Sequence, residues 1–292
     1  MSGGPFIELR VLGSGAAFSR RYGTTCSVLM VPSGACWLID CGRQAPEQLA
    51  AAGLGWHRVT GQLVTHVHGD HVYGLEEFAF VRYYTRGGGL AAVMKGGPRP
   101  ILAAHSAVLA ELWEVLGPSL RYRSNENGEP VPGTLEDYFE VLGPTHVEPP
   151  QRSAWNHAEA FLSADLHLIA RETRHVHGKP STSFEFALPG QNGRCAWWSG
   201  DAVVDADLLQ RLSARASVIF HDCTFTEFPG QVHGLFSDFE KLPPALREKI
   251  VLMHHEDDIE RYRGRAEALG FRLAMPGDVF NLADGSRLAR RS

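Results

Sequence analysis

The sequence predicts an α/β protein, because short apolar segments of strand type alternate with segments of helical periodicity along most of its length. One group of apolar runs, bounded by glycine and proline, opens the chain, and a second group returns after residue 166. At 292 residues, of which 44% are hydrophobic, the chain has enough apolar material for one large core or two small ones. Function must therefore be sought in motifs that interrupt this regular pattern.

The expected elements follow from these apolar runs and from the turn residues between them. Strands are expected at 6–12, 27–31, 35–40, 62–64, 100–104, 166–173, 183–188, 194–199, 217–220 and 250–253. Helices are expected at 46–52, 74–84, 106–116, 205–212 and 257–269. Asp205 is placed to cap one of them, and Gly270 to end another. A short helical piece is expected at 134–142, in a stretch too poor in apolar residues to form its own core.

Composition bounds the function and the compartment. A net charge of −5 argues against a general nucleic-acid binder, which normally carries a basic surface, but it leaves room for a small anionic substrate. The cysteines number five, an odd count, and none forms a Cys-x-x-Cys pair, which favours reduced thiols in a cytoplasmic protein. We see no apolar run that could span a bilayer, so no membrane contact is expected.

The segment 65–71, Thr-His-Val-His-Gly-Asp-His, carries four metal-ligand side chains directly after an expected strand. Side chains two apart in a strand share a face, so His66 and His68 can converge on one cation. The turn at Gly69 lets Asp70 and His71 reach a second. Imidazoles and carboxylates suit zinc, with iron and manganese as alternatives. The other interpretation is a histidine-rich loop that binds nothing.

This motif resembles that of the metallo-β-lactamase fold superfamily. The segments 11–18, 24–27 and 38–42 are similar to the opening of its ribonuclease Z-like and phosphodiesterase branch. The resemblance implies a four-layer αββα sandwich. It also implies a single domain over residues 1–292, and we expect an insertion or lid around residues 86–150, including a mobile loop near the site at 86–99.

The same resemblance implies the remaining metal ligands. His177 keeps the family's spacing to a following Pro-Ser pair, and His175 is the alternative. Asp201 ends a Ser-Gly-Asp turn whose aspartate bridges both metals in the family; a local role as a helix cap is the other interpretation. His254 follows an apolar strand in the position of the last ligand, with His255 as its neighbour and alternative.

The resemblance therefore implies two divalent metal ions, with zinc favoured. Their expected ligands are His66, His68, His177 and Asp201 for one ion, and Asp70, His71, His254 and Asp201 for the other. Paired ions of this kind share a water whose pKa falls to about 7. The bridging hydroxide is the expected nucleophile, and Asp70 is expected to orient it.

Two further segments favour a phosphate substrate. Residues 221–225 resemble the family's His-Glu-Ala-Thr-Phe segment, and His233 lies about where ribonuclease Z-like proteins carry a phosphate-contacting histidine. Such a histidine would donate a proton or hydrogen bond to the developing charge. The chain departs from ribonuclease Z at 256–258, which read Glu-Asp-Asp.

The sequence thus predicts a dinuclear metal-dependent phosphodiesterase acting on a small nucleotide or short nucleic acid. Too few residues separate His177 from Asp201 for the long arm that grips transfer RNA in bacterial ribonuclease Z. The enzymatic alternative is an ester, thioester or lactone hydrolase. The non-hydrolase alternative is a diiron redox or sensor protein, although flavodiiron relatives usually carry Glu where this chain has His68. A homodimer is a further possibility that the sequence leaves open.

Overall fold

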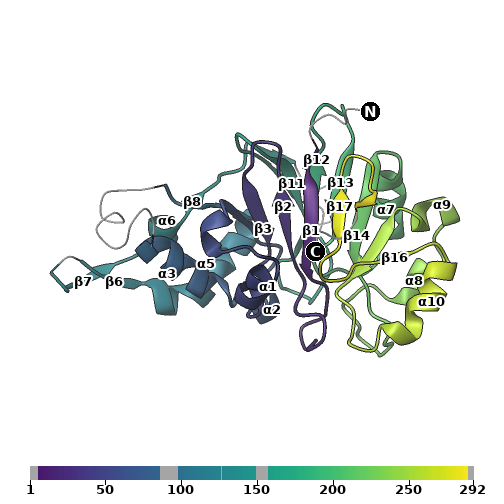
Figure 1. The fold of residues 1–292 in the computed structure, drawn as a ribbon, viewed down its shortest axis with the longest axis horizontal. Helices are drawn as coiled ribbons and strands as arrows, with labels where there is room; N and C mark the ends of the chain where they lie inside the picture. The colour runs from purple at the N-terminus through teal and green to yellow at the C-terminus, as the bar shows by residue number, and fades with distance from the viewer. Residues whose placement is uncertain (1–5, 86–97, 126, 149–156, 289–292) are drawn as a thin grey trace.

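The apolar runs of the sequence pair into two large sheets whose inner faces pack against each other (Figure 1). The computed structural model describes residues 6–85, 98–125, 127–148 and 157–288. Within these residues, no helix combines the length and apolar composition needed to cross a bilayer. The expected loop at 86–99 lies almost wholly outside the described residues.

The first sheet has eight strands in the order β18-β17-β1-β2-β3-β4-β5-β8. Its strands are β1 (Glu8–Gly13), β2 (Cys26–Met30), β3 (Cys36–Ile39), β4 (Gly61–Leu63), β5 (Ile101–Ala103), β8 (Glu140–Val141), β17 (Val279–Asn281) and β18 (Arg287–Leu288). The run from β3 to β8 is parallel, so the carboxyl ends of these strands meet at one edge.

The second sheet also has eight strands, in the order β16-β15-β14-β13-β12-β11-β10-β9. They are β9 (His146–Glu148), β10 (Ala158–Leu162), β11 (His167–Glu172), β12 (Thr182–Ala187), β13 (Cys195–Trp198), β14 (Ala216–Asp222), β15 (Ile250–Met253) and β16 (Arg272–Leu273). The four strands from β13 to β16 are parallel, and the rest are antiparallel.

Helices cover the outer face of each sheet and complete four layers (Figure 1). On the first sheet lie α1 (Ala45–Ala51), η1 (Trp56–Arg58), α2 (Gly69–Val72), α3 (Leu75–Thr85), α5 (Ser106–Leu120) and α6 (Leu135–Tyr138). On the second lie α7 (Ala206–Ser213), α8 (Phe236–Phe239), α9 (Pro244–Arg247) and α10 (Glu260–Ala268). The predicted αββα sandwich is confirmed.

Three apolar clusters stabilise these layers, one between the sheets and one under each helical layer. The cluster between the sheets contains Phe184, Trp198 and Phe220, all essentially without solvent contact. Burying a side chain of this size stabilises the fold by about 1.5–3 kcal/mol. Both sheets are therefore held rigidly, which fixes the positions of the loops at their carboxyl edges.

The structure corrects several expected elements. The helical piece expected at 134–142 is only the short α6, after which the chain extends into β8. The helix expected at 106–116 continues to Leu120 and carries Pro118 in its last turn. Strands β9, β10, β16, β17 and β18 were not predicted; all but β10 have only two or three residues, too few to show a clear alternation of apolar and polar residues.

The range 86–150, expected to hold an insertion or lid, supplies strands to both sheets where it is described. Its other notable feature is the hairpin of β6 (Tyr122–Ser124) and β7 (Pro130–Pro132), which projects beyond α3 and α6 in Figure 1. A single domain over residues 1–292 stays a prediction, as does the lid.

Candidate metal centre

Six of the seven predicted metal ligands lie together where strands of both sheets end. His66 and His68 follow β4, and Asp70 and His71 belong to α2. Asp201 follows β13 in the second sheet, and His254 follows β15. The parallel strands within each sheet bring these ends to one edge, and the packing of the two sheets brings the two edges together.

One group of ligand atoms joins His66, His68, His175 and Asp201. Nε2 of His66 lies 2.9 Å from Nδ1 of His68, and Nε2 of His175 lies 3.3 Å from the same atom. Oδ2 of Asp201 is 3.7 Å from His66 Nε2 and 3.8 Å from His175 Nε2. One tetrahedral metal ion separates its ligand atoms by roughly 3.4 Å, so these spacings suit a single ion.

A second group joins Asp70, His71, Asp201 and His254. His71 Nε2 lies 3.2 Å from Asp70 Oδ2 and 3.3 Å from Asp201 Oδ1. His254 Nε2 lies 3.3 Å from Asp201 Oδ2 and 3.4 Å from Asp70 Oδ2. Asp201 belongs to both groups. Its Oδ2 faces the first group and His254, and its Oδ1 faces His71 of the second group. This is the arrangement that a bridging carboxylate requires.

His175, the alternative to the expected His177, is the histidine that lies in the first group. His177 is exposed, in a turn with Gly178 at φ +78°, and lies outside both groups. His175 is buried, and its Nδ1 lies 3.0 Å from the carbonyl oxygen of Val232. That contact places the proton on Nδ1 and leaves the Nε2 lone pair facing the group.

His254, and not its neighbour His255, lies in the second group. His255 is buried and instead contacts Ser14 Oγ at 3.2 Å and the Ala274 carbonyl at 3.1 Å. It therefore joins the segments that carry Ser14 and Ala274. His254 and Asp40 are the non-glycine residues with positive φ in the described chain, at 58° and 57°. Such conformations cost of order 1–3 kcal/mol and concentrate at functional sites.

Asp40, at the end of β3, orients His71, and sequence reasoning missed it. Its Oδ2 lies 2.8 Å from His71 Nδ1, and its Oδ1 accepts from the backbone amide of Thr65 at 2.8 Å. With Nδ1–H donating to Asp40, the lone pair of His71 Nε2 faces carboxylate oxygens. That buried Nε2 makes no hydrogen bond within the described residues. A metal ion is the partner that such a nitrogen requires, so the residues fit the implied ions.

Asp222, at the end of β14, was missed in the same way. Its Oδ2 lies 2.8 Å from His233 Nδ1, and its Oδ1 lies 3.4 Å from His254 Nδ1. The half-buried His233 ring stacks on His254 with centroids 4.9 Å apart. His233 therefore lies beside the candidate centre, in contact with Asp222 and His254. An acidic residue at the carboxyl end of a mainly apolar strand was the available signal for both Asp40 and Asp222.

A sequence model of the family described as Anti-Pycsar protein Apyc1 matches residues 7–275. This chain belongs to the Apyc1 family. An Anti-Pycsar protein Apyc1 from Paenibacillus harenae is 32% identical over 260 residues, which cover 89% of this chain and 94% of that protein.

Solved structures agree on the fold of this Apyc1-family chain. The metallo-β-lactamase fold protein YhfI from Bacillus subtilis superposes with a TM-score of 0.63 at 13% identity, covering 95% of this chain and 99% of YhfI. The short form of human tRNase Z gives a TM-score of 0.58 at 20% identity, covering 98% of this chain and all of that one. The predicted metallo-β-lactamase fold is confirmed.

The pKa shifts of the residues at the Apyc1-family centre distinguish groups suited to bind a cation from His233, which is suited to carry a proton. Burial opposes ionisation of Asp70 and Asp201, yet neighbouring imidazoles outweigh it and hold both carboxyl pKa values well below the usual range. Burial, and then His175, lower the pKa of His68 to about 4. Burial opposes protonation of His233, but the Asp222 carboxylate raises its pKa above the ordinary value. Ionised carboxylates and a neutral His68 are the ligand forms that divalent cations bind.

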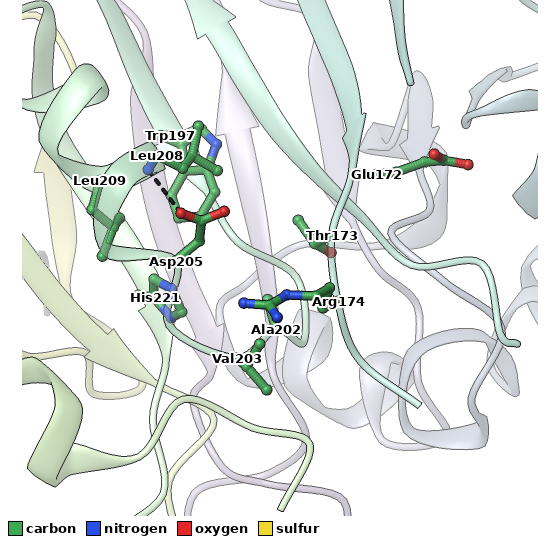
Figure 2. A pocket seen from close by; sticks show the side chains of 10 residues that line it. All are labelled: Glu172, Thr173, Arg174, Trp197, Ala202, Val203, Asp205, Leu208, Leu209 and His221. Atoms are coloured by element: carbon green, nitrogen blue, oxygen red, sulfur yellow. Dashed lines mark hydrogen bonds between the residues drawn. The ribbon is translucent and has the colours of Figure 1, made fainter. Parts of the chain in front are cut away.

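A separate pocket of about 310 Å³ lies on the helical side of the second sheet (Figure 2). Trp197, His221 and Leu208 line it, together with Asp205, which caps α7 by accepting from the Leu208 amide at 2.9 Å. None of the predicted metal ligands lines it. The pocket is therefore distinct from the metal centre.

Proposed function

We propose that this chain is a dinuclear metal-dependent phosphodiesterase that hydrolyses a small nucleotide. The observation that carries the proposal is the Asp201 carboxylate shared by two ligand groups, with the Asp222–His233 pair beside it. One ion would be held by His66, His68, His175 and Asp201, and the other by Asp70, His71, His254 and Asp201. Two bound ions, with zinc favoured, would supply an activated water near neutral pH and neutralise charge on the phosphate.

Other residues of the chain orient the metal-binding histidines and donate the proton. Asp40 and the Val232 carbonyl fix the tautomers of His71 and His175, so each presents Nε2 to its group. Asp222 holds His233 through Nδ1, which leaves Nε2 to donate to the leaving oxygen or to the developing charge. The raised pKa of His233 keeps it protonated nearer to neutral pH than an ordinary histidine.

The net charge of the chain and its family membership narrow the class of substrate that we propose. A chain with net charge −5 suits a small, weakly charged phosphodiester better than a long nucleic acid. Membership of the Anti-Pycsar family favours a cyclic nucleotide within this class. We therefore propose a cyclic mononucleotide as substrate and the linear monophosphate as product.

The test compares wild-type protein with His233→Ala on a panel of cyclic nucleotides, a short RNA and bis-nitrophenyl phosphate. We expect hydrolysis of cyclic nucleotides by the wild type. His233→Ala should keep both metals and lose about 10²–10³ in kcat, the usual effect of removing one transition-state donor. The exposed His146→Ala serves as the matched control and should behave as wild type.

Ester, thioester and lactone substrates belong in the same panel. A wild-type protein that opens lactones or thioesters and ignores every phosphodiester would refute the phosphate assignment while leaving the metal centre standing. Iron binding with oxygen consumption and no hydrolysis would support the redox alternative instead. Full activity of His233→Ala on its best phosphodiester would remove His233 from the reaction.

A further inference from the structure

A second cluster of metal-ligating side chains shares no residue with the metal centre and takes its members from both sheets. His105 directly follows β5 of the first sheet and caps α5. His157 directly precedes β10 of the second sheet, and Glu159 is the second residue of that strand. His105 and Glu159 are each 2% exposed, and His157 is partly buried. None of the three has a role in the proposed reaction.

The three ligand atoms lie within 4.8 Å of one another. His105 Nε2 lies 2.8 Å from His157 Nδ1 and 3.9 Å from Glu159 Oε1. These distances bracket the roughly 3.4 Å that separates ligand atoms around one tetrahedral ion. The spacings at the metal centre bracket it in the same way, from 2.9 Å between His66 and His68 to 3.8 Å between His175 and Asp201.

We propose that His105, His157 and Glu159 form a separate metal site that binds one Zn²⁺ ion and joins the two sheets. Two histidines and a glutamate are a known zinc ligand set, which leaves a fourth position for water. The site goes beyond the proposed phosphodiesterase and does not depend on it.

The surroundings of the cluster support a cation. The second oxygen of Glu159 accepts from the Ser106 amide at 2.8 Å, which fixes the carboxylate. Glu172, whose side chain in Figure 2 points away from the rest of the pocket, accepts from the His157 amide at 3.3 Å and adds negative charge. Together these carboxylates offset the charge of a divalent ion.

Metal binding breaks two hydrogen bonds of His105, one of which joins its Nε2 to Nδ1 of His157 at 2.8 Å. In the metal-bound form, His105 Nε2 is a ligand and Nδ1 carries the proton, so Nδ1 gives up its long 3.3 Å contact with the Ala107 amide. The first turn of α5 keeps the bond from Ser106 to Glu159. Each lost contact is a neutral hydrogen bond of about 1 kcal/mol, and the two together are much weaker than a zinc site.

The experiment measures zinc content after dialysis against trace zinc and gel filtration. Asp201→Ala removes the shared ligand of the metal centre, and we expect this variant to retain one equivalent of zinc. Adding His157→Ala should lose that equivalent, whereas adding His146→Ala, an exposed histidine on the neighbouring strand β9, should not. Cobalt substitution in Asp201→Ala should give the visible absorption of a four-coordinate ion, lost on adding His157→Ala.

Folding and function are separated by two further measurements. Circular dichroism and a cooperative thermal transition must show each variant folded; Glu159→Gln, which keeps an acceptor for the Ser106 amide, replaces any variant that is not. Zinc should raise the Tm of Asp201→Ala and leave that of the double variant unchanged. An Asp201→Ala protein without zinc, or a wild type whose zinc content is unaltered by His157→Ala and Glu159→Gln, would overturn the site. If the metal centre itself binds no zinc, Asp201→Ala will bind as much zinc as the wild type. That result is different from the loss of the His105–His157–Glu159 site.

Discussion

Replacing Asp40 with asparagine should weaken metal binding without touching a metal ligand. Asp40 Oδ2 accepts from His71 Nδ1, and Oδ1 accepts from the Thr65 amide, both at 2.8 Å. An amide group has one acceptor and one donor, so Asp40→Asn cannot serve both partners. Asparagine tolerates the positive φ of 57° at this position, so the backbone can be kept.

Either orientation of the new amide has a measurable cost. If the NH₂ group faces His71, it forces the proton onto Nε2, and His71 can no longer present a lone pair. Outer partners of this kind are worth about 10–100-fold in metal affinity, or about 1.4–2.8 kcal/mol. If the NH₂ group faces Thr65, a buried amide loses its acceptor, which costs about 1–3 kcal/mol of stability.

Two assays distinguish these outcomes. Competition with a chromophoric chelator gives zinc affinity, and urea unfolding with excess chelator gives the metal-free free energy of unfolding. Asp278→Asn is the control, because Asp278 is also buried and accepts from a backbone amide, that of Met275, but is no metal ligand; its ion pair with Arg287 sets the stability change expected of the control. An Asp40→Asn protein with wild-type affinity and wild-type stability would refute the reasoning.

The remaining predictions concern stability and its pH dependence. Phe220→Ala should cost about 3–5 kcal/mol in urea unfolding, since the ring fills the core between the sheets. Asp205→Ala should cost about 1 kcal/mol by removing the cap of α7, whereas the exposed neighbour Asp207→Ala should change little. Burial lowers the pKa of His221, so below about pH 6.5 the unfolded chain binds the proton first and stability falls as pH falls. His221→Gln should flatten that loss by up to about 1.4 kcal/mol per pH unit, measured by urea unfolding in chelator.

The sequence alone determined the fold class and the part of the centre that lies in one continuous segment. His66, His68, Asp70 and His71 follow a strand within six residues, so local geometry is enough to bring them together. The longer helices, such as α3, α5 and α7, were placed to within a few residues because their periodicity is local. Shorter strands carry too little pattern to be seen.

Tertiary structure decided what depends on partners distant in the chain. Residues two apart in an extended segment share a face, so spacing could not separate His175 from His177. The carbonyl of Val232, 57 positions further along the chain, contacts His175, while the turn at Gly178 leaves His177 exposed. Asp40 likewise acquires its role only because β3 lies beside β4, which places its carboxylate against His71.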